Sequence, residues 1–178
     1  MESRAKLFGH PIHPMLIVFP LGLLATSVGF DIAYLVTDDR YWAGIAYYLL
    51  GIGIATGLIA AVFGLIDWLA IPSGTRAKRI GALHGIGNVV VVGLFLVSCL
   101  MRWSTVPDSP SMAAIVLSWL GVGLALITGW MGGELVDRLA VGVDEGAHLN
   151  SPSSLSGRPA HEDTIRPEVP PTETRRVA

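Results

Sequence analysis

The stretch Met112–Gly133, MAAIVLSWLGVGLALITGWMGG, decides the fold of this chain. It contains no charged residue, and the first charge after it is Glu134. A helix needs about 20 apolar residues to cross the hydrocarbon core of a bilayer, and this stretch has that length. Three earlier stretches, residues 14–36, 43–71 and 80–101, have a similar length and apolar character. The sequence therefore predicts an all-α fold, a four-helix transmembrane bundle.

The overall composition agrees with this prediction. Of the 178 residues, 52% are hydrophobic and 15% are charged, whereas a soluble domain has about 25% charged residues. Most charges lie in residues 37–40, in residues 72–79 and in the final third of the chain. The alternative, an unusually apolar soluble bundle, does not explain this segregation. We expect the lipid bilayer as the main partner and no nucleic acid, because the chain has no basic patch suited to phosphates.

The chain changes character after the last apolar stretch. From Gly142 onward, prolines alternate with serine, threonine, glutamate and arginine, and the apolar residues follow no helical or strand-like spacing. Such a segment buries too little apolar surface to offset the entropy of ordering it. We therefore expect two parts, a four-span transmembrane domain at residues 9–143 and a disordered cytoplasmic tail at residues 144–178. His148 and His161 fall in this tail and are interpreted as solvated residues.

The distribution of basic residues predicts an orientation. Four spans place the N-terminus, residues 72–79 and the tail on one side of the membrane. The basic residues near the span ends on that side are Arg4, Lys6, Arg76, Lys78, Arg79 and Arg138. The other side has Arg40 and Arg102, accompanied by Asp38, Asp39 and Asp108. Because cytoplasmic loops carry the excess of lysine and arginine, both termini are predicted to be cytoplasmic.

The segment Gly9-His10-Pro11-Ile12-His13-Pro14 precedes the first span and contains two histidines, each followed by proline. Imidazole is the commonest metal ligand in proteins. A residue before proline is biased away from the α region, so we expect both histidines on an extended segment. Pro14 suits the first turn of the helix that follows.

Polar side chains converge on one end of the predicted bundle. Because the spans alternate in direction, the starts of the first and third spans lie beside the ends of the second and fourth. These four places hold His10, His13, Asp67, His84 and Glu134. The opposite end has Asp31 and no histidine. Imidazole with carboxylate suits iron or zinc, so all five residues are candidate metal ligands.

Two further features of this end bear on its chemistry. Asn88 lies one turn beyond His84 on the same helix face, where it could hydrogen-bond a ligand. Each residue also has a structural interpretation: Asp67 could pair with Arg76, Lys78 or Arg79, Glu134 could pair with Arg138, and the histidines could be interface residues. Charges at the membrane interface cost far less than charges at the midplane.

Several motifs resemble those of a known family. They are the opening Gly9–Leu16 with Phe19-Pro20, Gly64–Trp68, His84 with Asn88, and Gly129–Leu135. They resemble a bacterial family of predicted four-helix inner-membrane proteins, labelled a domain of unknown function, over about residues 9–143. Many relatives carry a histidine where this chain has Val18. Some are fused to Rieske-type iron–sulfur domains, so the resemblance implies redox chemistry and a redox partner protein.

Two functional classes follow. In the first, the cluster binds a b-type haem, with His13 and His84 as axial ligands and Asn88 beside them, or an iron or zinc ion held by all five residues. In the second, the protein is a scaffold or partner subunit whose polar cluster only ties helix ends together. A transporter ranks third, because the spans place almost no polar group at the midplane. Whether the protein is an enzyme stays open.

Small residues recur every fourth position in the last span. Gly121, Ala125, Gly129 and Gly133 would let another helix approach closely. This helix could belong to the same chain or to a second copy, so the face is a candidate for homo-oligomer contacts.

Overall fold

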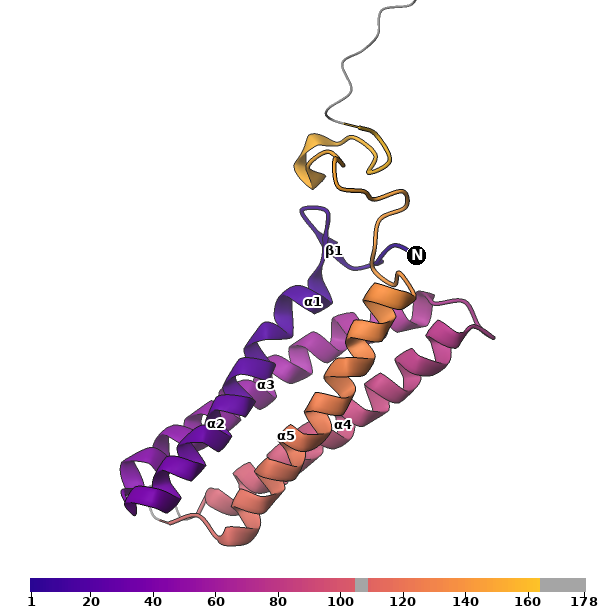
Figure 1. Cartoon of the computed structure of the whole chain (residues 1–178). Coiled ribbons are helices and arrows are strands. Elements are labelled where there is room, and N and C mark those ends of the chain that lie inside the picture. Colours follow the sequence, from indigo (N-terminus) through magenta and orange to yellow (C-terminus); the bar gives the residue numbers. More distant parts are fainter. Residues whose placement is uncertain (105–108, 164–178) are drawn as a thin grey trace, which may run out of the picture.

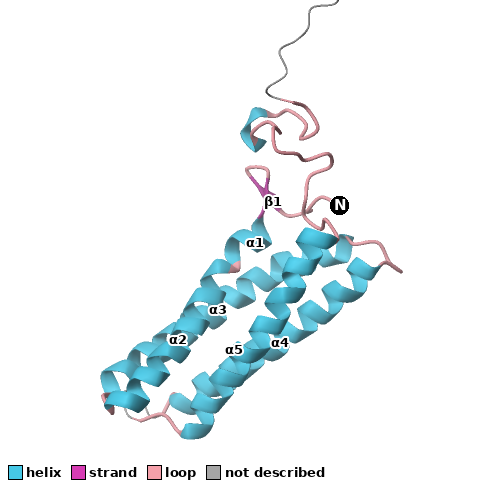
Figure 2. Cartoon of the chain, viewed as in Figure 1, coloured by secondary structure: helices cyan, strands magenta, loops and turns pink. Residues whose placement is uncertain are grey.

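The computed structural model describes residues 1–104 and 109–163. Four long helices run antiparallel as a bundle: α2 (Val18–Thr37), α3 (Arg40–Ala70), α4 (Arg76–Arg102) and α5 (Met112–Gly133) (Figures 1 and 2). The short helix α1 (Ile12–Leu16) leads into α2, and the π-helical turn η1 (Glu134–Arg138) extends α5. In the described part of the chain, four helices are long and apolar enough to cross a membrane. The predicted fold class is confirmed.

The starts of three helices are explained by capping side chains. Asp39 accepts the backbone N–H of Tyr41 at the start of α3. Thr75 accepts from Lys78 at the start of α4, and Ser111 caps α5 in the same way. A side-chain oxygen at this position satisfies one of the backbone donors that a helix leaves free at its N-terminus. The sequence thus marks where three of the four spans begin.

The N-terminal segment differs in part from the prediction. Strand β1 (Lys6–Leu7) pairs antiparallel with strand β2 (His10–Pro11), and the turn between them uses a positive φ of 81° at Gly9. His10 is therefore extended, as expected. The prediction of an extended His13 is wrong, because α1 already begins at Ile12. Proline is tolerated in the first turn of a helix, so Pro14 does not prevent this earlier start.

The junction between α1 and α2 also follows from a proline. Ile17 is a turn residue between the two helices. Pro20 has no backbone N–H, so it cannot donate to the carbonyl four residues before it, that of Leu16. The first span is thus one apolar helix of residues Ile12–Thr37 with an interruption at Ile17.

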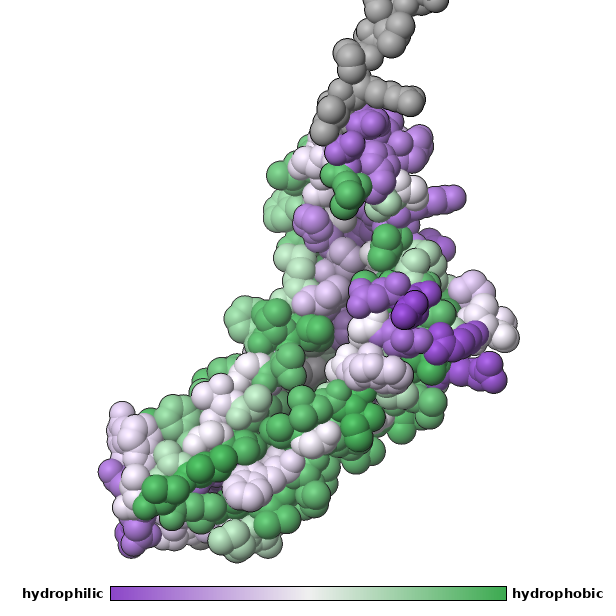
Figure 3. All heavy atoms as spheres, in the orientation of Figure 1, coloured by the Kyte–Doolittle hydropathy of each residue, from purple (hydrophilic) through white to green (hydrophobic). Residues whose placement is uncertain are grey.

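The bundle consists of two hairpins. The first hairpin (residues 12–70) holds α1, α2 and α3, and the second hairpin (residues 76–138) holds α4, α5 and η1 (Figure 1). Helices pack most extensively within each hairpin, less between α3 and α4, and least between α2 and α5. The core between the hairpins is formed by Leu24, Leu50, Ile54, Val91 and Phe95. Large apolar side chains cover the outside of the bundle (Figure 3).

Close helix contacts occur at glycines. A Cβ at Gly53 would lie 2.7 Å from Leu24, and one at Gly121 would lie 2.8 Å from Phe95. Of the small-residue face considered for oligomer contacts, Gly121 and Ala125 thus pack within this chain. A Cβ at Gly129 would meet nothing within 4 Å. The role of this face in an oligomer stays a prediction.

The N-terminal segment and the segment after η1 meet at one end of the bundle, here called the terminal end (Figure 1). Gly142 donates its backbone N–H to the carbonyl of Met1, and Lys6 pairs with Asp144. The described part of the predicted tail is loop with one turn of 3-10 helix, η2 (Ser154–Ser156). Residues 164–178 of that tail lie outside the described residues, and the predicted division at residues 143 and 144 stays a prediction.

Candidate functional site

Two histidines face each other where the two hairpins meet. The ring centroids of His13 and His84 are 6.4 Å apart, and the ring planes cross at 87°. His13 comes from α1 of the first hairpin, and His84 lies in the third turn of α4 in the second hairpin. Both side chains are partly buried. We call these two residues the histidine pair.

Each ring is fixed to a backbone carbonyl of its own hairpin. Nδ1 of His13 lies 2.8 Å from the carbonyl oxygen of Ala60, and Nδ1 of His84 lies 2.8 Å from that of Thr128. A carbonyl oxygen can only accept a hydrogen bond, so Nδ1 carries the proton in both rings. The neutral form of each imidazole then has its lone pair on Nε2, which is the atom available to bind a metal.

The two Nε2 atoms have different surroundings. The side-chain N–H of Asn88 donates to Nε2 of His84 at 3.2 Å and also to the backbone carbonyl of His84 at 2.9 Å. The hydroxyl of Thr128 donates to the oxygen of Asn88 at 3.0 Å, which fixes the orientation of the amide. Nε2 of His13 has no hydrogen-bond partner among the described residues. One imidazole nitrogen is thus capped by an amide and the other is free.

Glycines leave room for both rings. A Cβ at Gly64 would lie 2.9 Å from the ring of His13, and one at Gly132 would lie 3.2 Å from the ring of His84. Each glycine is four residues after the residue whose carbonyl holds that ring. In both hairpins, the helix that packs against the histidine (α3 or α5) provides a carbonyl for the ring nitrogen. One turn later, a glycine in the same helix leaves space for the ring.

Asp67 binds the N-terminal segment. The hydroxyl of Ser3 lies 2.8 Å from both carboxylate oxygens, and the backbone N–H groups of Arg4 and Ala5 donate to Asp67 at 2.7 and 3.3 Å. The alternative interpretation, a pairing of Asp67 with Arg76, Lys78 or Arg79, is not found among the hydrogen bonds and ion pairs of the described residues. The carboxylate instead holds the N-terminal segment against the C-terminal end of α3.

The remaining predicted ligands also have other partners. Glu134 pairs with Arg76 at 2.7 Å, where the sequence suggested Arg138. His10 lies 3.3 Å from the hydroxyl of Ser154. In residues 1–104 and 109–163, no group of three or more histidine, cysteine, aspartate or glutamate side chains is arranged to hold a metal ion. Of the five candidate ligands, the structure brings His13 and His84 together.

Sequence reasoning missed a buried ion pair at the far end of the bundle. Arg102 donates two hydrogen bonds to Asp31, at 2.6 and 2.8 Å, and both residues are almost fully buried. Ser98 and Ser118 also contact the guanidinium of Arg102. The expectation that Arg102 lies beyond the end of the third span is wrong, because α4 continues through this residue and its side chain is buried. The signal was a carboxylate within the first apolar run, Asp31, and an arginine directly after the third, Arg102.

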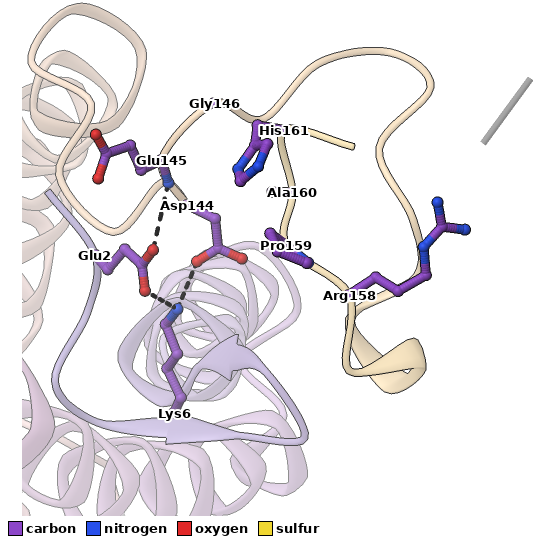
Figure 4. Close-up of a pocket in the computed structure, with 9 residues that line it drawn as sticks. All are labelled: Glu2, Lys6, Asp144, Glu145, Gly146, Arg158, Pro159, Ala160 and His161. Atoms are coloured by element: carbon purple, nitrogen blue, oxygen red, sulfur yellow. Dashed lines mark hydrogen bonds and ion pairs between the residues drawn. The ribbon is translucent and has the colours of Figure 1, made fainter. Parts of the chain in front are cut away.

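A charged pocket lies outside the bundle at the terminal end. Lys6 contacts Glu2 and Asp144, and Arg158 and His161 line the same pocket (Figure 4). The hydrogen bonds from Lys6 to Asp144 and to Glu2 raise the pKa of Lys6 above its ordinary value. The hydrogen bond from Lys6 lowers the pKa of Glu2. This pocket joins residues 1–7 to the segment after η1.

The fold and the site define a class: a helical membrane protein of four spans, built from two hairpins that meet at paired histidines. Residues 9–145 match the model of the family described as Predicted membrane protein (DUF2231), and the chain belongs to this family. The resemblance inferred from the motifs is confirmed, over nearly the same residues. No curated protein and no solved structure matches the chain.

Proposed function

We propose that the histidine pair binds a b-type haem as its two axial ligands, and that the protein passes electrons at the terminal end of the bundle. The observation that supports this is the fixing of both rings by a hydrogen bond from Nδ1 to a backbone carbonyl. Metal-binding histidines almost always donate their second nitrogen in this way, which sets the tautomer and the ring orientation. Haem supplies one-electron redox chemistry when bound.

The distance between the rings fits two imidazoles on opposite sides of one metal. With metal–nitrogen bonds of about 2.0–2.1 Å, such rings have centroids roughly 6–6.5 Å apart. The observed separation is 6.4 Å.

The number of ligands favours haem over a bare ion. A structural or catalytic zinc site uses three or four protein ligands, whereas haem brings four nitrogens of its own and needs one or two from the protein. The histidine pair supplies two. The amide of Asn88 would have to release Nε2 of His84, and it would keep its bonds to Thr128 and to the carbonyl of His84.

The spectrum of the purified protein tests this proposal. The full chain is purified in detergent, supplied with haemin, and measured by visible absorption and metal analysis. We expect a Soret band with one haem per chain, and its loss in His13→Ala and in His84→Ala. His148→Ala is the matched control, because that histidine lies in the exposed segment after the bundle.

Two results would contradict haem binding. Stoichiometric iron or zinc without a Soret band, lost in Asp67→Asn as well as in the histidine variants, would support the metal ion held by several residues. Neither haem nor metal in the wild-type chain would support the scaffold. One observation already favours the scaffold as second candidate, because Asp67, Glu134 and His10 all have partners within the chain.

We also propose that the terminal end faces the cytoplasm of a bacterium, with the chain in the inner membrane. The basic residues Arg4, Lys6, Arg76, Lys78 and Arg79 at this end support the orientation. An electron-transfer partner would then be a cytoplasmic protein or domain.

A further inference from the structure

The first helices of the two hairpins carry equivalent residues at a constant spacing. His13 and His84 are separated by the same 71 residues as Asp31 and Arg102. The same spacing joins two further pairs in which both residues are buried. These are Leu24 with Phe95, and Ser27 with Ser98. Four positions of α1 and α2 thus return in α4 in the same order.

The second helices repeat in the same way, with a constant spacing of their own. The matching positions of α3 and α5 are buried in both hairpins or adjoin a histidine. They are Ala46 with Ala114, Leu50 with Ser118, Gly53 with Gly121, Ala60 with Thr128, and Gly64 with Gly132.

The contacts between these positions repeat as well. Leu24 fills the space at Gly53 in the first hairpin, and Phe95 fills the space at Gly121 in the second. The carbonyls that hold the histidine rings, those of Ala60 and Thr128, are also equivalent. A chance similarity in composition would not reproduce these contacts.

We infer that the chain contains two copies of one helical hairpin, related by an approximate two-fold axis along the bundle, and that Asp31 and Arg102 are positioning residues for the histidine pair. Each helix packs mainly on two neighbours, so α2 lies diagonally opposite α4, as a two-fold axis requires. The axis passes between His13 and His84 at one end and between Asp31 and Arg102 at the other. Parallel repeats of this kind occur in membrane proteins.

The ion pair joins the hairpins at equivalent positions with opposite charges. Two identical hairpins would place like charges face to face, whereas this chain has a carboxylate in one copy and a guanidinium in the other. The bidentate geometry fixes the relative register of α2 and α4. His84 lies in α4 itself, and His13 lies in α1, which leads into α2, so a change in this register would also change the approach of the two histidines.

The equivalence of the two hairpins can be tested by exchanging the two charged residues between them. Asp31→Asn and Arg102→Gln each leave one buried charge without the opposite charge, which is strongly destabilising. Asp31→Arg combined with Arg102→Asp restores the pair at the exchanged positions. Ser27 is equivalent to Ser98 and can support the new arginine, but Leu50 stands where Ser118 would be needed. Adding Leu50→Ser and Ser118→Leu exchanges the full polar set.

Two measurements are made on each variant in detergent: the thermal midpoint of the haem-free protein, and the fraction of supplied haem bound as six-coordinate low-spin haem. We expect both to fall in the single variants. The two-residue exchange should recover part of each loss, and the four-residue exchange should recover more than half. Leu50→Ser alone is the control and should lower the midpoint.

The outcomes separate this inference from the proposed function, on which the haem measurement depends. If neither exchange raises the thermal midpoint above that of the single variants, the equivalence of the two hairpins is overturned. If the midpoint recovers and the haem bound by a haem-binding wild type does not, Asp31 and Arg102 are structural and the positioning role is rejected. If the wild-type chain binds no haem, the proposed function fails and the positioning role fails with it. The thermal midpoints of the exchange variants still test whether the two hairpins are equivalent.

Discussion

Asp67 binds Ser3 across the terminal end of the bundle, with the hydroxyl of Ser3 2.8 Å from each oxygen of the carboxylate. The residue that the sequence suggested as a metal ligand is therefore the anchor of the N-terminal segment. Because this segment leads through β1 and β2 into α1, the anchor also helps to place His13.

Replacing Asp67 should destabilise the terminal end. Asp67→Asn removes the charge that accepts from Ser3, Arg4 and Ala5, and hydrogen bonds to a charged group contribute about 1.5–3 kcal/mol. We expect a lower thermal midpoint in detergent. Glu162→Gln is the control: both it and its partner Arg158 are exposed, and exposed pairs contribute about 0–1 kcal/mol. Equal effects of the two variants would contradict the anchoring role.

The proposed orientation can be tested by labelling in whole cells. In a Cys99→Ala background, a cysteine at Ser109 should react with an impermeant thiol reagent, and a cysteine at Ser73 should not. The two residues lie in loops at opposite ends of the bundle and are both exposed. Labelling at Ser73 alone would reverse the orientation and place the histidine pair near the outer face.

Alanine at the packed glycines should separate the helices of each hairpin. We expect Gly53→Ala and Gly121→Ala each to destabilise the protein by about 1–3 kcal/mol, as overpacking in a core does. Gly123→Ala is the matched control on α5, because a Cβ there would meet nothing within 4 Å. Thermal unfolding in detergent measures the difference. A loss at Gly123 as large as that at Gly121 would argue against close helix contact.

The contact between the two ends of the chain should depend on pH. The lowered pKa of Glu2 stabilises the contact above its ordinary value of 4.5, and this contribution is lost as the pH falls through the pKa of the folded state. The raised pKa of Lys6 stabilises the contact below its ordinary value of 10.5, and this contribution is lost as the pH rises through the folded pKa.

Hydrogen exchange of the segment after η1 reports this contact. Protection should be greatest between these two limits and should fall on either side of them. Lys6→Gln should reduce protection at neutral pH, because it removes the partner of both Glu2 and Asp144. Protection that does not change with pH or with this substitution would mean that other contacts hold the segment.

The sequence predicted the four spans of the fold, and at the site it predicted that His13 and His84 lie close together. The spans are long and apolar, and three of them begin at a capping residue, so their existence follows from the residues alone. The approach of His13 and His84 follows from the alternating direction of the spans. The partners of Asp67 and His10 could not be predicted, because they depend on loop conformations that no periodic pattern encodes.

The ion pair of Asp31 and Arg102 was missed for a different reason. Arg102 directly follows the apolar run that ends at residue 101, and a charge at that place is ordinarily interpreted as the end of a span. The helix continues through it, because the carboxylate of Asp31 offers a better partner than the interface does. A charge at the end of one span and an opposite charge inside another span predict an ion pair only when the two residues lie at the same depth in the membrane.

The burial of this ion pair has a consequence for how the protein is made. Asp31 leaves the ribosome 71 residues before Arg102, so the first hairpin is synthesised before the arginine that pairs with Asp31. An ionised side chain within a span is costly until it is paired. We therefore expect the first hairpin to be stably inserted only once α4 arrives, and we expect chains truncated before α4 to be degraded faster than the full chain.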